Sequence, residues 1–187
     1  MKKNYTISLF TAGFLFVGYL LVWLSVYHAD YQLREQLLRE VNVVARDIDK
    51  EQLKVFSGTS ADRLNPLYIE CKAKLSERCK ARAKCRFLYL LGKKSNEEIF
   101  FFVDSELAGS AELSPPGQIY DEASPVLKRV FRTGHAETEG PLPDRWGVWV
   151  TGFVPLVDQQ SHKVIAVLGM DVDAADWTLE IVTRSAL

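Results

Sequence analysis

The first thirty residues contain one long apolar run. From Ile7 to Tyr27 the chain reads ISLFTAGFLFVGYLLVWLSVY, with no charged residue. A run of roughly twenty apolar residues is long enough to cross a bilayer as a helix. Lys2 and Lys3 precede it, and positive charge on the short leading side favours a cytoplasmic N-terminus. The pattern therefore predicts a cytoplasmic tip and a membrane anchor in residues 1–28, with the rest of the chain exported.

A cleaved signal peptide is the alternative explanation for this run. The apolar stretch is longer than the apolar region of a usual signal peptide, and the SVYHAD that ends it offers no small-residue cleavage site. Tyr19, Trp23 and Tyr27 lie toward its outer end, where amphipathic aromatic rings favour the headgroup layer. An uncleaved anchor is the preferred interpretation.

The next segment, residues 29–58, has the periodicity of an amphipathic helix. No Pro or Gly interrupts it before Gly58, so one long helix is predicted to leave the membrane and end near that glycine. Its apolar stripe packs either on the chain's own domain or on a second copy in a homodimer, and the sequence leaves both open. The residues of the stripe recur at spacings of three and four: Leu33, Leu37, Val41, Val44 and Ile48.

The remainder, residues 59–187, alternates helix signals with strand signals and is expected to be the exported domain. Asn65 and Pro66 form an N-cap and first-turn pair, and Gly134 is a helix stop. The expected helices cover 66–81, 122–132 and 173–186. The expected strands are aromatic and β-branched runs at 86–91, 98–104, 147–157 and 163–172. This order predicts an α+β domain with one antiparallel sheet and flanking helices.

Pro155 lies inside the third of these expected strands. Proline has no N–H to donate to a neighbouring strand, so it is confined to edges and bulges of sheets. We therefore expect an edge or a bulge at this point of the strand.

Charge and motif content argue against several classes of function. The 187 residues carry 23 Lys+Arg against 24 Asp+Glu, so no overall field draws the chain toward nucleic acid. Segment 72–86 holds seven basic residues. If the domain is exported, this segment does not meet nucleic acid, so the basic residues are expected to form a solvent-exposed face of a helix. The sequence has no P-loop, nucleophile elbow or zincin motif, and its three histidines are scattered. The sequence thus predicts neither an enzyme nor a metal or cofactor site.

Three cysteines lie close together, at 71, 79 and 85. Cys71 and Cys79 are eight residues apart on one predicted helix, about 12 Å by helical rise, which is too far for a disulfide. Cys79 and Cys85 can pair if the helix ends between them. An odd number of cysteines leaves a free thiol or an intermolecular link, and a redox sensor is a minor alternative to inert buried thiols.

Five segments carry a family resemblance, in the order CRFLYLLG, FFFVDSE, SPPGQIYDEAS, EGPLPDRWGVWV and VIAVLGMDVDAADW. Together they resemble the extracytoplasmic, PAS-like sensor domain called Cache, as found in bacterial sensor histidine kinases and diguanylate cyclases. The resemblance covers about residues 53–177. It implies a single Cache domain that senses a ligand for signal transduction, such as a two-component system, from the periplasmic or extracellular side of the bacterial inner membrane.

In such receptors a second transmembrane helix leads from the sensor to a cytoplasmic output domain. Only ten residues follow Trp177, and the charged Glu180 and Arg184 among them interrupt any membrane span. These residues therefore resemble neither a second transmembrane helix nor an output domain. The output domain is therefore expected to be absent from this chain, which is either the leading part of a longer receptor or a short variant. Histidine kinase or diguanylate cyclase activity would belong to the full-length receptor.

The resemblance also places a ligand between the sheet and the loops and helix that cross it. Arg145 can fork onto a carboxylate, and Asp171 can bind an amine. Each candidate also has a structural explanation, such as a turn salt bridge, a place in the core or a helix cap. The full amino-acid-binding pattern of double Cache domains is not present. The candidate ligand-binding residues are Asp104, Tyr120, Arg145, Trp146, Trp149 and Asp171.

The competing function is a membrane-anchored module that binds a partner or serves a structural role, with no ligand. An open pocket lined by Arg145 and Asp171 would favour sensing of an unidentified small molecule. A pocket filled by its own apolar side chains would favour the ligand-free module.

Overall fold

The computed structural model describes residues 2–186, with side chains from residue 11 onward. Two terminal residues lie outside the described part of the chain: Met1, which begins the expected segment 1–28, and Leu187, which ends the expected segment 59–187. The side chains of residues 7–10 in the predicted anchor are not described either. The elements are α1 (Lys2–Arg46), α2 (Lys50–Leu53), η1 (Ser60–Leu64), α3 (Pro66–Lys80), β1 (Phe87–Lys93), β2 (Ile99–Asp104), α4 (Pro125–Thr133), β3 (Glu137–Asp144), β4 (Gly147–Val157), β5 (Val164–Asp173) and α5 (Ala174–Ser185).

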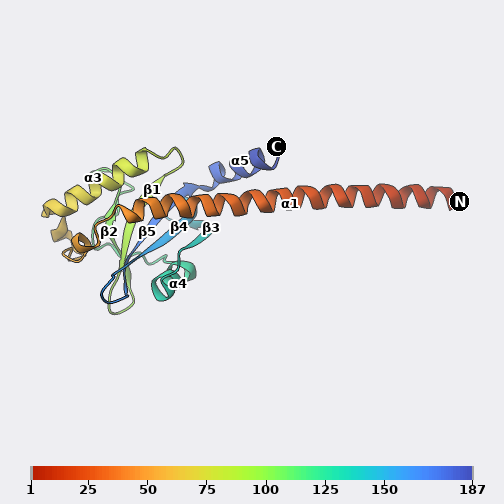
Figure 1. Cartoon of the computed structure of the whole chain (residues 1–187). Coiled ribbons are helices and arrows are strands. Elements are labelled where there is room, and N and C mark those ends of the chain that lie inside the picture. The colour runs from red at the N-terminus through yellow and green to blue at the C-terminus, as the bar shows by residue number, and fades with distance from the viewer. Residues whose placement is uncertain (1, 187) are drawn as a thin grey trace.

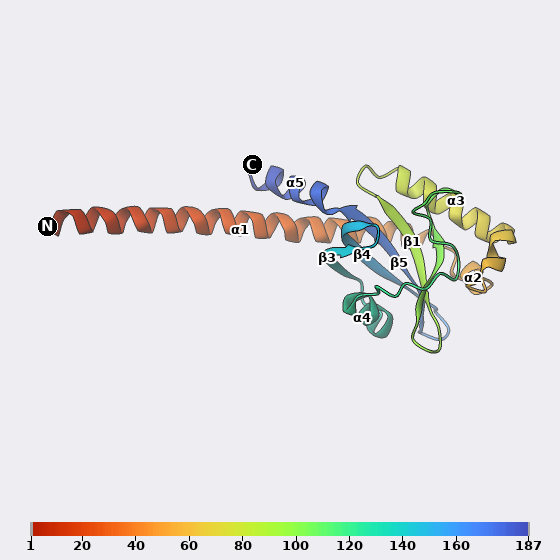
Figure 2. The ribbon, with the colours of Figure 1, turned by 180° about the vertical axis from the view of Figure 1, so that it is seen from behind.

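Helix α1 has two parts with different surroundings. Its N-terminal part projects away from the rest of the molecule, and its C-terminal part lies along the domain (Figures 1 and 2). The projecting part exposes large apolar side chains such as Phe14, which is 80% exposed. In the described chain, the stretch Thr11–Arg46 is the one helix long and apolar enough to cross a membrane.

The predicted helix through Gly58 is too long, because α1 ends at Arg46. The carboxylate of Asp49 accepts hydrogen bonds from the backbone N–H groups of Glu51 and Gln52 and so begins α2 as a separate helix. A short acidic side chain competes for backbone donors in this way and favours a cap over a helix interior. The chain therefore turns at 47–49 where the apolar periodicity alone predicted continuation.

The five strands form one antiparallel sheet in the order β2-β1-β5-β4-β3. This confirms the predicted α+β class and the four predicted strands. The edge strand β3 was not predicted, because its sequence ETEGPLPD contains two prolines and a glycine. The register between β3 and β4 shifts between Glu139 and Leu142, so the prolines occupy an irregular edge strand, where they are tolerated.

Pro155 lies in β4 beyond the reach of β3. Going along β4, Phe153 is the last residue that pairs with β3, and its partner is Glu137. The pairing of β4 with β5 then shifts register between Leu156 and Val157. At Pro155 the strand is therefore a local edge beside a bulge, as predicted.

Side chains alternate between two cores on opposite faces of the sheet. In β1, Leu88 and Leu90 point to the core shared with α1 and α3, whereas Phe87, Tyr89 and Leu91 point to the core shared with α4. The views in Figures 1 and 2 likewise place α1 and α3 on one side of the sheet and α4 on the other. The apolar stripe of α1 is buried in its own domain, with Leu33, Leu37, Val41 and Val44 at 5% exposure or less.

Helix α5 returns along α1 from the end of the sheet (Figure 1). Asp173 caps its start by accepting from the N–H of Ala175, as predicted for that residue. Trp177 Nε1 donates to Asp30 Oδ1 at 2.8 Å, and Ser25 Oγ donates to the carbonyl of Ser185 at 3.1 Å. The two helices are therefore joined along the length of α5.

Candidate functional site

A small pocket lies on the α4 face of the sheet, between β1, β5 and the segments that cross them. The free space between its walls is about 20 Å³, which is room for roughly one water molecule. Any larger ligand therefore requires a wall to move. The lining residues are Phe87, Tyr89, Phe101, Asp104, Glu112, Ser114, Tyr120, Asp144, Trp146 and Asp171.

Asp171 forms the floor of this pocket. It lies in β5 between Phe87 of β1 and Thr151 of β4, and only 4% of it is exposed. Tyr89 Oη and Thr151 Oγ1 donate to Asp171 Oδ1 at 3.0 and 2.7 Å. Burial raises the pKa of Asp171 to about 7, against the effect of these two hydroxyl donors. The floor is a carboxyl group at the centre of the sheet, with both of these bonds on one oxygen.

Asp104 holds the two ends of a loop over the pocket. Its Oδ1 accepts from the N–H of Glu106 at 2.8 Å, and its Oδ2 accepts from the N–H of Ser114 at 2.6 Å. Burial raises the pKa of Asp104 against the effect of these donors. Both carboxylate oxygens are used, so Asp104 mainly fixes segment 105–114 as one wall of the pocket.

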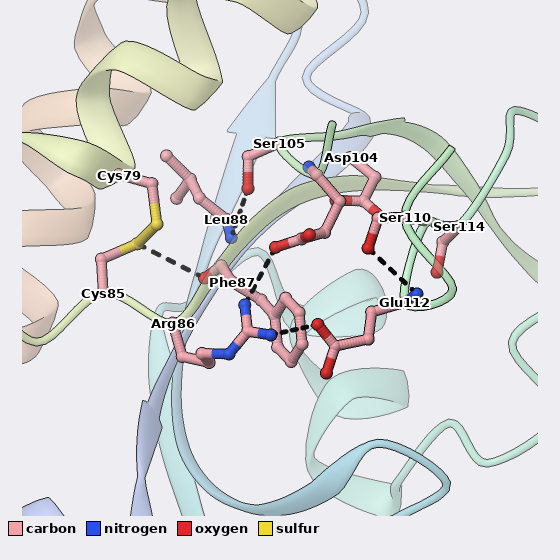
Figure 3. A network of polar contacts seen from close by, with 11 residues as sticks. Cys79, Cys85, Arg86, Phe87, Leu88, Asp104, Ser105, Ser110, Glu112 and Ser114 are labelled. Carbon is pink, nitrogen blue, oxygen red and sulfur yellow. Dashed lines mark hydrogen bonds and ion pairs between the residues drawn. A yellow bond between two sulfur atoms is a disulfide. The ribbon is translucent and has the colours of Figure 1, made fainter. Parts of the chain in front are cut away.

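Arg86 ties the same loop to β1. Its Nη1 donates to Glu106 Oε1 at 2.9 Å, and its Nη2 pairs with Glu112 (Figure 3). The guanidinium carbon also lies 4.0 Å from the centre of the Phe87 ring. Arg86 therefore links the pocket residues Glu112 and Phe87 from outside the lining.

A third wall comes from the turn between β3 and β4. Asp144 Oδ1 accepts from the N–H of Trp146 at 2.9 Å, from the N–H of Gly147 at 3.1 Å and from Trp149 Nε1 at 2.9 Å. The Trp146 ring lies 6.0 Å from that of Phe101. One carboxylate oxygen thus sets the turn and directs Trp146 toward the pocket.

The structure brings four of the six candidate residues together, namely Asp104, Tyr120, Trp146 and Asp171. Trp149 lies behind this lining, with its ring edge-on to Phe87 at 5.2 Å. Arg145 is on the surface, where it pairs with Asp121 and with Glu122 Oε2, the latter at 3.2 Å. Its guanidinium lies 5.0 Å from the Trp146 ring, so it supports that ring from the solvent side.

Sequence reasoning missed six lining residues. Phe87 and Tyr89 share a sheet face with Asp171 only through the β1–β5 register, which no local pattern specifies. Asp144 was not among the predicted candidates. Alternation along β1 was the one available signal, because it puts residues 87, 89 and 91 on one face. The missed residues are Phe87, Tyr89, Phe101, Glu112, Ser114 and Asp144.

The cysteines lie next to this site but do not line it. Cys79 and Cys85 form a disulfide, and α3 ends between them at Lys80 (Figure 3). Cys71 is a buried free thiol, and its burial raises its pKa to about 11. Such a thiol is unreactive at neutral pH.

The basic segment 72–86 is largely paired within the molecule. Lys74 pairs with Glu70, Arg78 with Asp47 and Lys84 with Glu180. Among the residues that the structure describes, no group of three or more His, Cys, Asp or Glu side chains is arranged to hold a metal ion.

Comparisons with known proteins find solved structures of similar fold but no matching family. A scan against protein-family models gives no match, and a search of curated proteins gives none either. Among solved structures, the ligand-binding domain of the Campylobacter jejuni chemoreceptor Tlp3 in complex with L-valine aligns with a TM-score of 0.55 and 13% identity, over 86% of this chain and 60% of that chain.

Two further structures give similar values. The same Tlp3 domain in complex with 4-methylisoleucine aligns with a TM-score of 0.56 and 13% identity, over 86% of this chain and 58% of that one. An extracellular ligand binding receptor from Desulfohalobium retbaense aligns with a TM-score of 0.58 and 11% identity, over 86% of this chain and 26% of that one. This chain spans 60% or less of each of these neighbours. At such identities the likeness shows the fold alone, and that fold is the one used by these bacterial sensory domains.

Proposed function

We propose that this chain is a membrane-anchored, ligand-sensing domain of a bacterial signal-transduction receptor, of the Cache type. The observation that carries the proposal is Asp171, a carboxyl group buried at the floor of a pocket whose walls are loops and aromatic rings. Burying a carboxylate is unfavourable unless a partner compensates it, so its retention is typical of a functional site. The structural neighbours, which are titled as ligand-binding or sensory domains, support the same proposal.

In this proposal the pocket binds a small molecule through Asp171, and the part of the loop between the two Asp104 attachments, residues 107–113, moves outward to admit it. Asp171 accepts hydrogen bonds from a protonated nitrogen of the ligand. Tyr120 and Trp146 pack on its apolar part. Asp104 keeps the loop ends in place, while Arg145 and Trp149 support the wall from behind.

The proposed topology follows from α1. Residues 1–28 anchor the chain in the inner membrane with the N-terminus in the cytoplasm, residues 29–58 form the juxtamembrane segment, and residues 59–187 form the periplasmic sensor. The output is of the histidine kinase, diguanylate cyclase or chemoreceptor kind and lies on another polypeptide segment. Because the apolar stripe of α1 is buried in the domain, a homodimer would use the opposite face of α1, which carries Tyr31 and Val43.

Thermal unfolding of the full chain in detergent micelles tests the sensing function. The panel contains small amines, amino acids, carboxylates and nucleobases, each titrated over three decades of concentration. A ligand that binds only the folded state raises the unfolding midpoint in a concentration-dependent way. We expect such a rise for at least one class and its loss in Asp171→Asn. A panel with no rise, on a folded protein, would reject the sensing function.

The narrowness of the pocket favours a second candidate function. With about 20 Å³ of free space, the pocket is filled largely by its own side chains. This is the arrangement expected of a ligand-free module that binds a partner protein or serves a structural role. The same titration separates the two functions, because a ligand-free module gives no shift with any small molecule.

A further inference from the structure

The charge of the pocket lining is one-sided. Four carboxylates line it, together with five aromatic rings, and none of the ten lining residues is Lys or Arg. The carboxylates are Asp104, Glu112, Asp144 and Asp171, and the aromatic residues are Phe87, Tyr89, Phe101, Tyr120 and Trp146.

The cationic side chains around the pocket already have partners. Arg86 pairs with Glu106 and Glu112. Arg145 pairs with acidic side chains on the solvent side of Trp146. Lys72 Nζ donates to the backbone carbonyl of Asp104 at 2.5 Å and does not line the pocket. A carboxylate brought into the pocket would therefore find no free cation.

The four carboxylates are not equivalent toward a ligand. Asp104 is bonded on both oxygens, Asp144 Oδ1 holds three donors of its own turn, and Glu112 has Arg86 as its partner. Asp171 is bonded by two neutral hydroxyls, both on Oδ1. Asp104, Asp144 and Asp171 all lack a cationic partner among the described residues. Of these three, Asp171 is the one that holds no N–H donor, and its Oδ2 accepts no hydrogen bond.

Building on the proposed sensing function, we propose that the ligand is an organic cation that carries no carboxylate group, such as a primary amine or a quaternary ammonium compound. The cationic nitrogen lies over Asp171, and the surrounding rings add cation–π attraction, which is strongest where water is excluded. A ligand carboxylate would be desolvated among like charges with no cation to compensate it, and this disfavours amino acids.

This specificity differs from that of the structural neighbours. Structures of the Tlp3 domain contain L-valine, isoleucine or L-norvaline, each of which carries a carboxylate beside its amine. The arginine adjacent to the pocket turn here, Arg145, points to solvent and pairs with Asp121 and Glu122.

Matched pairs of compounds test the proposal directly. Each pair differs by one carboxylate: isobutylamine against L-valine, phenethylamine against L-phenylalanine, and tetramethylammonium against glycine betaine. Affinity is measured by calorimetry on the full chain in detergent micelles at pH 8. We expect at least one member without a carboxylate to bind about tenfold or more tightly than its partner, because the partner leaves a buried charge unpaired.

Two variants control the measurement. Asp171→Asn should abolish binding of the cation, and its folding is checked by circular dichroism and its own unfolding midpoint. Glu77→Gln removes an equal charge at an exposed position of α3, outside the lining and the loop, and should leave the affinity unchanged. Equal or tighter binding of the amino acid or betaine, if lost in Asp171→Asn, overturns the cation proposal and leaves the sensing function intact. Absence of binding by any compound of any class rejects both.

Discussion

At the scale of single residues, the ionisation of Asp171 is the property that connects folding with the site. The groups that act on its ionisation are the hydroxyls of Tyr89 and Thr151 and the carboxylates of Asp144 and Glu139, together with burial. Burial opposes ionisation most strongly, and the two nearby carboxylates act in the same direction. The folded state therefore holds this proton to a higher pH than the unfolded chain does.

The first prediction concerns pH and stability. The pKa of Asp171 rises from 3.8 to about 7 on folding. Between these values the folded state binds more protons, so the free energy of unfolding falls as pH rises from about 4 to about 7, by up to a few kcal/mol. Asp171→Asn should remove this contribution and be more stable than wild type at pH 8. Urea unfolding at pH 5 and pH 8 checks it, and an equal pH dependence in both proteins would contradict it.

The second prediction concerns pH and binding. A cation prefers the ionised form of Asp171, so affinity for a cationic ligand should rise by roughly tenfold per pH unit below about pH 7 and level off above it. Binding below that pH should release a proton. Calorimetry in two buffers of different ionisation enthalpy measures that proton, and a pH-independent affinity would exclude Asp171 as the cation partner.

Some site residues could be predicted from the sequence, and others could not. Asp171 and Trp146 lie in distinctive motifs, and both line the pocket. The direction of Arg145 depends on a turn in which Asp144 accepts three hydrogen bonds, a geometry that motif spacing does not encode. Phe87 joins the site through pairing with a strand more than eighty residues away.

At the scale of elements, the loop between β2 and α4 contributes Glu112, Ser114 and Tyr120 to the pocket lining. Its second half is bonded to β2 through the backbone of residues 117–120, whereas Arg86 and Asp104 hold its first half, residues 105–114. Asp104 bonds to backbone groups and is buried, whereas the side chain of Arg86 is about one third exposed. The Arg86 attachment is therefore the more easily released of the two.

The third prediction is that Arg86→Gln loosens this loop without unfolding the domain. Partly exposed ion pairs contribute up to about 1 kcal/mol, so backbone amides in 105–114 should exchange hydrogen several-fold faster. Exchange in the central strands should change little. Hydrogen exchange with mass spectrometry resolves the two regions. Arg145→Gln, which breaks a comparable surface pair, is the matched control and should leave 105–114 unchanged.

The fourth prediction concerns the disulfide. Cys79 and Cys85 are six residues apart, and closing so short a loop stabilises a protein by about 2 kcal/mol in the chain-entropy account. Cys79→Ser combined with Cys85→Ser should lower the free energy of unfolding by about that amount. Urea unfolding measures it. If treatment of wild type with a reductant gives no comparable loss, the disulfide does not stabilise the fold.

Periodicity and caps predicted most elements but not every boundary. Asn65 and Gly134 mark helix ends in the structure as expected, with Gly134 in the left-handed conformation. The end of α1 at Arg46 was missed because the apolar spacing continues to Ile48, while the Asp49 cap redirects the backbone. Strand β3 was missed because tertiary pairing with β4 overrides its weak strand propensity.

At the scale of the whole molecule, α1 and the sheet form one packed unit. The apolar stripe of α1 crosses β4 at Gly152, where a side chain would meet Leu37 and Val41 at 2.9 and 3.2 Å. The absence of a side chain at Gly152 therefore allows α1 to approach the sheet closely.

The fifth prediction follows from this contact. Gly152→Ala should push α1 away from the sheet and lower the free energy of unfolding by about 1–3 kcal/mol, as overpacking does in well-packed cores. Thermal and urea unfolding measure the loss. Val148→Ala, an exposed position in the same strand, is the control and should change stability by less than about 0.5 kcal/mol. Equal effects in the two variants would show that α1 adapts freely to the sheet.

The contacts between α1 and α5 make the position of α5 along α1 a measurable property of the domain. Trp177 sits between Asp30, to which it donates a hydrogen bond, and Arg34, whose guanidinium lies 5.7 Å from its ring. Asp30 and Arg34 are one helical turn apart, so a slide of α5 by a few ångströms would exchange one contact for the other. Two spin labels, one on each helix near Ser25 and Ser185, would measure such a slide as a change in the distance between the helices.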